Sequence, residues 1–226
     1  MKNYLIVTAM KEELDGLIHY FPTTQETEKD IYFYQGNDFS FYAFIGGIGK
    51  VSMAYKLGLF LANHKIDLIF NVGVAGSISK KLKPFDTLIS KKVSYYDVDL
   101  LAFGYKRGQM ASMPLYYEAD EDTLSKIKQI QTDDIKFGLI VSGDSFVTKA
   151  NFDRSIYNDF DDPLAIDMES GSVAQVCYIA KIPFVIIRTI SDDTEEENND
   201  SKQYDNNLEK ATLKAGEIIY KVISSK

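Results

Sequence analysis

The stretch PLAIDMESGSVAQVCYIAKIPFVIIRTISD, residues 163–192, has the pattern of a strand, a helix and a second strand. Residues 163–167 form a short apolar run that ends in an acid, and 182–192 is rich in β-branched residues. The residues between them, 169–181, carry apolar side chains at helical spacing. A helix that connects two buried strands is typical of a largely parallel sheet covered by helices. The stretch therefore predicts an α/β fold.

The same alternation of strands and helices continues towards both ends of the chain. Residues 31–46 differ, because they alternate and break at Gly36-Asn37-Asp38, which indicates an antiparallel hairpin. No repeat, linker or change of composition divides the chain, so we expect residues 1–226 to form one domain. The other expected strands are 3–9, 67–76, 86–96 and 137–146, and the other expected helices are 11–21, 50–63, 121–131 and 206–224.

The overall composition argues against several classes of protein. The 226 residues are enough for one large domain with a sizeable core. A net charge of -8 without a basic run argues against non-specific nucleic-acid binding. No apolar stretch approaches the roughly 20 residues of a membrane span, and residues 1–13 are typical of a first strand, not of a signal peptide. The single cysteine, Cys177, fits a reducing compartment, so we expect a cytoplasmic protein.

Histidine is nearly absent from the chain. His19 and His64 are the only two, and neither has a pattern of acids or cysteine around it. The chain therefore has too few histidines for a histidine metal site and no pattern of a catalytic triad. We expect both histidines to be partly exposed residues of helical stretches. Any catalysis should depend on Asp, Glu, Arg and backbone groups.

Acidic, glycine-rich and apolar residues follow the ends of several expected strands. In α/β sheets, ligands bind beyond the carboxyl ends of the strands. The residues expected there suit a polar, hydroxyl-bearing ligand with one flat apolar part. Small residues at 170–174 would let a helix start approach such a ligand closely. The set comprises 9–13 (AMKEE), 73–76 (GVAG), Phe146, Val147, Met168, Glu169 and 191–193 (SDD).

Each of these features also has a plainer explanation. Glu12 and Glu13 could be first-turn acids favoured by the helix dipole. The segment GGIGK at 46–50 could bind phosphate, but it lacks the spacing of a P-loop and a tight turn is the simpler interpretation. The acidic segment 192–207 could be a solvated surface loop or a lid over a site. One shared site nevertheless explains the adjoining strand ends more economically than several separate explanations.

Seven short motifs, in order over nearly the whole chain, carry a resemblance to a known family. They are AMKEE (9–13), GIGK (47–50), NVGVAG (71–76), DVDLLAFGY (97–105), SGDSF (142–146), DME (167–169) and RTISD (188–192). On these motifs the chain resembles the methylthioadenosine/S-adenosylhomocysteine nucleosidases of the nucleoside phosphorylase superfamily. The set is specific, although no single motif is. Several positions depart from the family pattern. Val74 stands where many members have Ser, Lys11 replaces a common acid, Ala111 stands where a proline is often seen, and Tyr204 stands where the family has Phe.

The resemblance implies a fold, an assembly and a reaction. The fold is a single-domain α/β structure with a twisted mixed β-sheet flanked by helices, usually assembled as a homodimer. The reaction is hydrolysis of the bond between adenine and ribose in 5′-thio-substituted adenosines, without a metal and without a cofactor. The expected partners are a small nucleoside substrate and a second copy of the chain, with no nucleic acid and no membrane.

Two catalytic residues are implied by the same resemblance. Adenine is a poor leaving group as an anion, and Asp192 is implied as the general acid that protonates its N7. An Asp side chain has an ordinary pKa of about 3.9, so its protonation at neutral pH requires burial and bound adenine. Glu13 is implied as the base that activates the attacking water beneath the sugar.

The other implied residues bind the substrate. Asp167 would share a face with Glu169 only if the extended geometry continued past the strand, so we expect Asp167 to point away from the site. By the resemblance, Glu169 binds the ribose hydroxyls, Met168 and Met10 contact the sugar, and Arg188 orients Glu13 or the water. Phe146 stacks on adenine, the Val147 backbone binds the adenine edge, and Ala75 and Gly76 line the base and ribose pocket. Phe103 and Tyr105 enter the 5′-thio pocket of a dimer partner.

Three other functions stay open at this point. A purine or uridine phosphorylase would need a phosphate site after the first strand, where this chain reads TAMKEE and carries an acid that repels phosphate. A nucleosidase for another adenosine-like nucleoside, such as aminodeoxyfutalosine, would differ only in the 5′ pocket. A non-catalytic nucleoside-binding module would be expected to lack Glu13 or Asp192.

Overall fold

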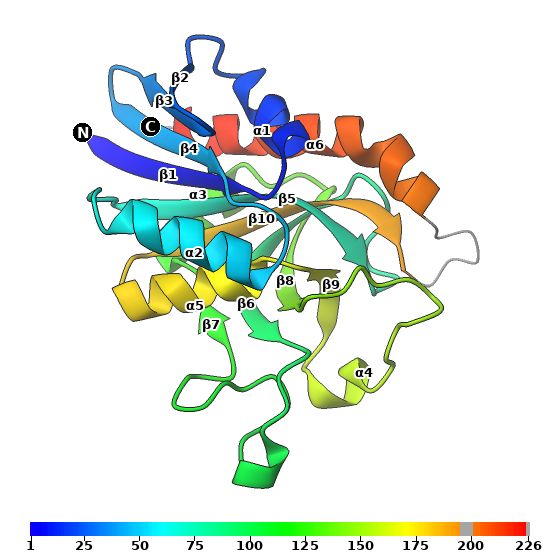
Figure 1. Ribbon diagram of the computed structural model, residues 1–226. Helices are drawn as coiled ribbons and strands as arrows, with labels where there is room; N and C mark the ends of the chain where they lie inside the picture. Colours follow the sequence, from blue (N-terminus) through cyan, green and yellow to red (C-terminus); the bar gives the residue numbers. More distant parts are fainter. Residues whose placement is uncertain (195–200, 225–226) are drawn as a thin grey trace.

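A computed structural model describes residues 1–194 and 201–224 of the chain (Figure 1). The strands are β1 (Lys2–Thr8), β2 (Gln25–Glu28), β3 (Ile31–Gln35), β4 (Phe39–Ile45), β5 (Leu68–Ser77), β6 (Thr87–Tyr95), β7 (Tyr117–Glu118), β8 (Ile135–Ser142), β9 (Pro163–Asp167) and β10 (Phe184–Asp193). The helices are α1 (Lys11–Ile18), α2 (Lys50–Leu61), α3 (Glu121–Gln129), α4 (Ile156–Asp159), α5 (Ser170–Ala180) and α6 (Ser201–Ser224), and a 3-10 turn, η1, spans Leu101–Phe103. Within these ranges, no helix combines the length and apolarity that a bilayer crossing needs.

The strands form one mixed sheet in the order β10-β6-β8-β9-β5-β1-β4-β3-β2, with β7 beside β6. Because β10 also pairs with β5, the strands β10, β6, β8, β9 and β5 close into a ring, and the other four extend from it as an open sheet. β1 lies parallel between β4 and β5, whereas β3 and β4 form the expected antiparallel hairpin. The predicted fold class, an α/β fold with a mixed sheet flanked by helices, is confirmed.

Helices cover both faces of this sheet, and the two largest apolar cores lie beneath them. Figure 1 shows α2 and α5 side by side on one face and α1 with α6 on the other. Successive residues of a strand point to opposite faces. Leu5 and Val7 of β1 therefore join the core that contains α2 and α5, while Ile6 joins the core that contains α1, α3 and α6. Burial on both faces is the reason why the central strands are continuous apolar runs.

Helices α1 and α6 touch at two glycines. A Cβ atom on Gly216 would lie 2.2 Å from the carbonyl oxygen of Gly16, and one on Gly16 would lie 2.5 Å from the carbonyl oxygen of Thr212. Only residues without Cβ allow two helix backbones to approach so closely. The crossing holds α6 against α1 over the shared core.

Most elements lie near their expected positions, and the differences have simple causes. β2, β7 and α4 were not expected, because each is too short to show a clear periodicity. The interpretation of 192–207 as one irregular segment is wrong at both ends, since β10 runs to Asp193 and α6 begins at Ser201, not near Asn206. Residues 195–200, the rest of the possible loop or lid, lie outside the described residues.

Candidate active site

The ends of β1, β5, β9 and β10 surround a cavity of about 370 Å³. This is the edge of an α/β sheet at which ligands bind. Its lining comes from Ala9, Met10, Glu13, Ile48, Val74, Ala75, Gly76, Ser145, Phe146, Val147, Ile166, Asp167, Met168, Glu169, Ser191, Asp192 and Tyr204. Most of the lining is apolar, so the carboxyl groups in it are poorly solvated.

Nine of the twelve residues expected at the site line this cavity, and they come from distant parts of the chain. They are Met10, Glu13, Ala75, Gly76, Phe146, Val147, Met168, Glu169 and Asp192. The other three, Phe103, Tyr105 and Arg188, lie elsewhere in the described structure. With Ile48 of GIGK, the fold thus brings six of the seven sequence motifs to the cavity wall within a single chain.

Glu13 lies in the first turn of α1, and three backbone N–H groups bind its carboxylate. Its Oε2 accepts from the nitrogens of Ala9 (2.7 Å) and Met10 (3.2 Å), and its Oε1 accepts from Val74 (3.0 Å). A Cβ on Gly73 would lie 2.2 Å from Oε1, so the carboxylate occupies space that only glycine leaves. Glu13 is therefore more than a first-turn acid, because it joins α1 to β5 and faces the cavity.

The surroundings of Glu13 adjust its basicity. The residue is only 5% exposed, and this burial raises the pKa of Glu13 above its ordinary value. The positive charge of Arg188 and the three N–H donors act in the opposite direction. A carboxylate with a raised pKa is a stronger general base near neutral pH than an ordinary one.

Asp192 lies near the end of β10, where a bulge shifts the pairing with β5 and sets it opposite Gly76. Asp192 is only 2% exposed, and its Oδ1 accepts a hydrogen bond from the Ser191 hydroxyl at 2.6 Å. A Cβ on Gly76 would lie 3.3 Å from Asp192 Oδ2 and 2.8 Å from Cγ2 of Thr194. Glycine at position 76 thus keeps a side chain out of the space beside the carboxyl group.

Asp167 is one of the residues that line the cavity, although it was left out of the expected site. β9 ends at Asp167, and the chain turns at once into α5, so strand alternation does not continue to Glu169. Across this turn, Asp167 Oδ1 accepts from the backbone nitrogen of Ser170 at 3.2 Å. The other oxygen, Oδ2, accepts from Arg188 Nε at 2.8 Å, and both side chains are only 2% exposed.

Arg188 lies behind the cavity wall, not on it. Besides Asp167, its guanidinium donates to the side-chain oxygen of Asn71 at 2.6 Å and to the Asn71 carbonyl at 3.3 Å. Asn71 in turn donates to the carbonyl of Val7 in β1. A buried cation needs such partners to offset its lost hydration. Arg188 thereby connects β10, β5 and β9 beneath the site, and its charge acts on Glu13 from a distance.

Glu169 stands at the start of α5 and is 7% exposed. Its Oε1 accepts a hydrogen bond from the backbone nitrogen of Gly49 at 2.8 Å. Burial, and to a smaller extent the negative charge of Asp167, raise the pKa of Glu169 to about 8, against the charge of Arg188 and the Gly49 N–H. The raised pKa favours the protonated form of Glu169, which can donate as well as accept hydrogen bonds.

Tyr204 and Ile48 are among the lining residues that were not expected at the site. Tyr204 of α6 packs edge-on against Phe146 with ring centroids 5.7 Å apart, and its hydroxyl lies 3.6 Å from Sδ of Met10. The sequence matched Tyr204 to an aromatic position of the family. It was not assigned to the site, because an irregular segment was expected there. Ile48 lies between two glycines and is 57% exposed. An apolar side chain within a glycine-rich turn is the sequence signal that could have indicated its role in the cavity wall.

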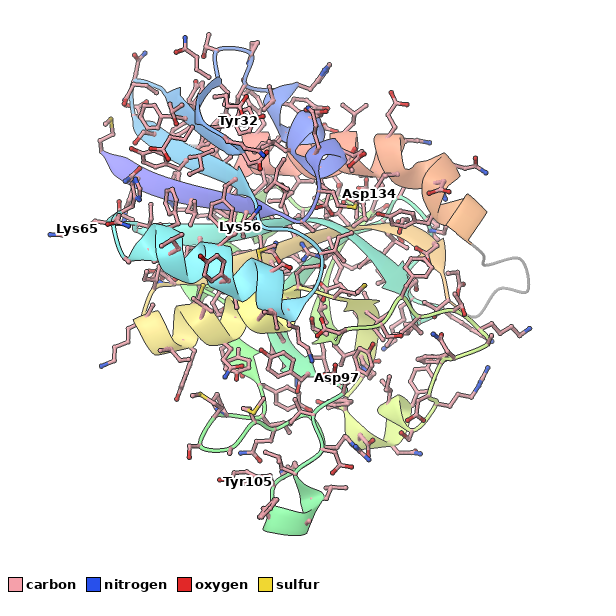
Figure 2. All side chains as sticks on the ribbon, viewed as in Figure 1. Tyr32, Lys56, Lys65, Asp97, Tyr105 and Asp134 are labelled. Carbon is pink, nitrogen blue, oxygen red and sulfur yellow. The ribbon has the colours of Figure 1, made fainter. Side chains whose placement is uncertain are left out.

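Phe103 and Tyr105 lie on the segment around η1, well away from the cavity of their own chain. Figure 2 shows Tyr105 near the tip of this projecting segment. Phe103 is 78% exposed, which is unusual for a phenylalanine. Their expected role needs a second copy of the chain.

The comparisons with known proteins agree over nearly the whole chain. The sequence model of the phosphorylase superfamily matches residues 3–224. A 5′-methylthioadenosine/S-adenosylhomocysteine nucleosidase from Exiguobacterium sp. is 36% identical over 224 residues, which cover 96% of this chain and 95% of the relative. The solved structure of the nucleosidase of that name from S. pneumoniae, with the transition-state inhibitor MT-ImmA, matches with a TM-score of 0.91 at 29% identity over 98% of both chains. S-adenosylhomocysteine nucleosidase from Streptococcus pyogenes, in complex with 5-methylthiotubericidin, gives a TM-score of 0.90 at 30% identity over 98% of this chain and 96% of that one.

The chain is a member of the phosphorylase superfamily, because the superfamily model matches residues 3–224. The fold and the cavity at its strand ends agree with this class. The extent and identity of the match to the curated relative narrow this class further. The chain belongs to the 5′-methylthioadenosine/S-adenosylhomocysteine nucleosidases of this superfamily. The family indicated by the seven motifs is therefore confirmed.

Proposed function

We propose that the protein hydrolyses the N-glycosidic bond of 5′-methylthioadenosine and S-adenosylhomocysteine, releasing adenine and the thioribose. The observation that carries this proposal is the enclosure of Glu13, Glu169 and Asp192 in one largely apolar cavity, beside the aromatic ring of Phe146. The relatives with this name and the solved complexes with MT-ImmA and 5-methylthiotubericidin support the same substrate class.

The two catalytic roles follow from where charge develops. Cleavage of the bond leaves positive charge on the sugar and negative charge on the base. Asp192 donates its proton to N7, so adenine departs as a neutral molecule. Glu13 takes a proton from a water that attacks the sugar carbon as the bond breaks. The raised pKa of Glu13 supports this role, as does its carboxylate, which three N–H donors hold in place.

The other lining residues divide into a sugar side and a base side. On the sugar side, Glu169 binds the ribose hydroxyls, and Met168 and Met10 cover the sugar. On the base side, Phe146 stacks on adenine, and the Val147 backbone reads its edge. Ala75 and Gly76 line the floor between them, and Arg188 acts from behind the wall by fixing Asp167 and by its charge on Glu13.

Hydrolysis is favoured over phosphorolysis by the position of Glu13. After β1, a phosphorylase would need positive or N–H groups directed at phosphate. Here the N–H groups of Ala9, Met10 and Val74 are already bound by the Glu13 carboxylate. A carboxylate repels phosphate and accepts a proton from water.

We also propose that the protein is a homodimer in the cytoplasm. Val51, Tyr55 and Leu59 form an exposed apolar stripe along α2, and Tyr178 and Ile179 extend it at the end of α5. These five residues are named here the apolar face. An exposed apolar surface of this kind is typical of an interface. The exposure of Phe103 on the projecting segment around η1 supports the expected roles of Phe103 and Tyr105 in the 5′-thio pocket of a partner.

Glu13→Gln and Asp192→Asn test the proposed chemistry most directly. Each variant should release adenine from methylthioadenosine at least about a hundredfold more slowly than wild type, because each removes one proton transfer. Binding of adenine, measured by calorimetry, should change by only a few-fold. Glu12→Gln is the matched control, because Glu12 is exposed beside Glu13 and should retain full turnover. Turnover of either catalytic variant within a few-fold of wild type would contradict the assigned roles.

A further inference from the structure

One lysine at the start of α2 binds two acidic residues from other parts of the chain. Lys50 Nζ lies 2.6 Å from Asp97 Oδ2, on the segment after β6, and 3.8 Å from Asp144 Oδ2, in the loop after β8. Its side chain is 23% exposed, and those of Asp97 and Asp144 are 29% and 47% exposed. This cluster of three residues is named here the Lys50 network. Nothing in the proposed chemistry uses it.

Backbone hydrogen bonds make the Lys50 network more than a pair of surface contacts. Asp144 Oδ1 accepts from the backbone nitrogen of Lys50 at 2.8 Å, and Asp97 Oδ2 accepts from the backbone nitrogen of Asp144 at 3.0 Å. Each carboxylate is therefore bound both by the ammonium and by a backbone N–H. The ammonium also lies 5.3 Å from the centre of the Tyr95 ring. One cation thus connects the start of α2, the end of β6 and the loop after β8.

The segments joined by the Lys50 network carry both sides of the cavity. Gly49, directly before Lys50, donates its N–H to Glu169 on the sugar side. Two residues after Asp144, Phe146 forms part of the base side. Gly49 has φ +87, and a Cβ there would lie 3.2 Å from Asp144 Oδ1, so the backbone is fitted closely to this carboxylate. Lys50 itself is absent from the cavity wall.

We propose that Lys50 is a positioning residue for nucleoside binding, which holds the Gly49 N–H against Glu169 and the Phe146 loop over the base. The inference rests on the proposed function of the same cavity. Without the ammonium, the negative charges of Asp97 and Asp144 repel one another, so the loop and the start of α2 separate. Glu13 and Asp192 keep their own partners, from α1, β5 and β10, and do not depend on Lys50. The effect therefore falls on substrate binding and not on the chemical step.

Steady-state kinetics with methylthioadenosine test this assignment. Lys50→Met should raise KM at least about tenfold and change kcat by less than about threefold. Lys50→Arg retains the charge and should restore KM to within about threefold of wild type. Lys56→Met is the matched control on the same helix. Lys56 lies on the side of α2 that faces β4, where it donates to the carbonyl of Ile45 at 2.9 Å. Asp97 lies below the amino end of α2, away from Lys56 (Figure 2). The control should leave KM unchanged.

A calorimetric titration with adenine separates this inference from the proposed reaction. Lys50→Met should bind adenine at least about fivefold more weakly than wild type, whether or not the wild type turns over methylthioadenosine. Adenine affinity and KM equal to those of wild type would overturn the role of Lys50, and so would a loss confined to kcat or shared by Lys56→Met. If Lys50→Met does not fold, Asp97→Ala removes the contacts of Asp97 with the Lys50 ammonium and the Asp144 N–H and should also raise KM. If wild type binds adenine and Lys50→Met weakens that binding, but wild type releases no adenine from methylthioadenosine, only the proposed reaction is overturned.

Discussion

At the scale of single residues, the central feature is a group of carboxyl groups enclosed in a mostly apolar cavity. Glu13 and Glu169 both have raised pKa values because burial disfavours their charged forms. The same two groups are satisfied differently, since Glu13 accepts three backbone N–H bonds and Glu169 accepts one. The free enzyme therefore keeps Glu169 less well solvated than an exposed acid. Bound ribose hydroxyls would supply the missing hydrogen bonds.

This arrangement predicts that Glu169→Gln stabilises the free protein in a pH-dependent way. The folded pKa of Glu169 is raised to about 8 from an ordinary value of 4.5. Between these values the folded protein holds a proton that the unfolded chain has lost, so the contribution of Glu169 to stability falls as pH rises through this window. Glutamine cannot ionise and avoids this loss. At pH 8 the variant should melt at least about 2 °C higher than wild type, which corresponds to at least about 1 kcal/mol.

Thermal melts of both proteins from pH 5 to pH 8, without ligand, measure this difference. The gap in Tm should be small near pH 5 and should widen towards pH 8. A gap that is constant with pH, or a variant that is less stable than wild type at pH 8, would contradict the raised pKa of Glu169.

At the scale of elements, the site depends on how helices are held against the strand ends. Glu13 is on α1 and Tyr204 is on α6, and these two helices meet where Gly16 and Gly216 bring their backbones together. A substitution that separates the helices would act on the core and on both cavity residues at once. The glycines are thus as important to the site as the residues in its wall.

Gly216→Ala should destabilise the protein by about 1–3 kcal/mol, because its Cβ would lie 2.2 Å from the Gly16 carbonyl oxygen and force the helices apart. Denaturant unfolding followed by circular dichroism measures the change. Glu217→Ala on the same helix is the control, since its half-exposed pair with Lys221 contributes only about 0.5 kcal/mol. Equal stability of Gly216→Ala and wild type would show that α1 and α6 do not cross as described.

The elements were largely predictable, because buried strands and amphipathic helices leave clear periodic patterns. The hairpin 31–46 and the strand-helix-strand stretch 163–192 are examples. The place of Asp167 in the cavity wall could not be predicted, because the position of a residue at a strand end depends on where the next helix begins. The position of Arg188 behind the wall was equally hidden, because its partners Asn71 and Asp167 are far from it in sequence. Tyr204 was missed as a wall residue because α6 begins earlier than its polar sequence suggested.

At the scale of the whole molecule, the main feature is the exposed apolar face on α2 and α5. The seven motifs include DVDLLAFGY, whose Phe103 and Tyr105 lie far from the cavity of their own chain. A second copy bound at α2 and α5 would account for this motif and for the exposed side chains together. The prediction that residues 1–226 form one domain stays a prediction, as do the individual roles of the site residues.

Leu59→Glu should convert the proposed dimer into a monomer, because it places a charge within the apolar face. Light scattering coupled to size-exclusion chromatography measures the mass, and adenine release should fall at least about tenfold through loss of the partner's aromatic side chains. Gln129→Glu, which adds the same charge on the exposed side of α3, should leave both unchanged. A wild-type protein that is monomeric would contradict the proposal outright.

The central claim is that this cavity uses water, activated by Glu13, to release adenine from a 5′-thioadenosine. The most direct measurement incubates the purified protein with methylthioadenosine, with and without phosphate, and identifies the products. The account predicts adenine and free methylthioribose, formed at the same rate in both conditions. Formation of a sugar 1-phosphate that requires phosphate, or no release of adenine at all, would contradict it.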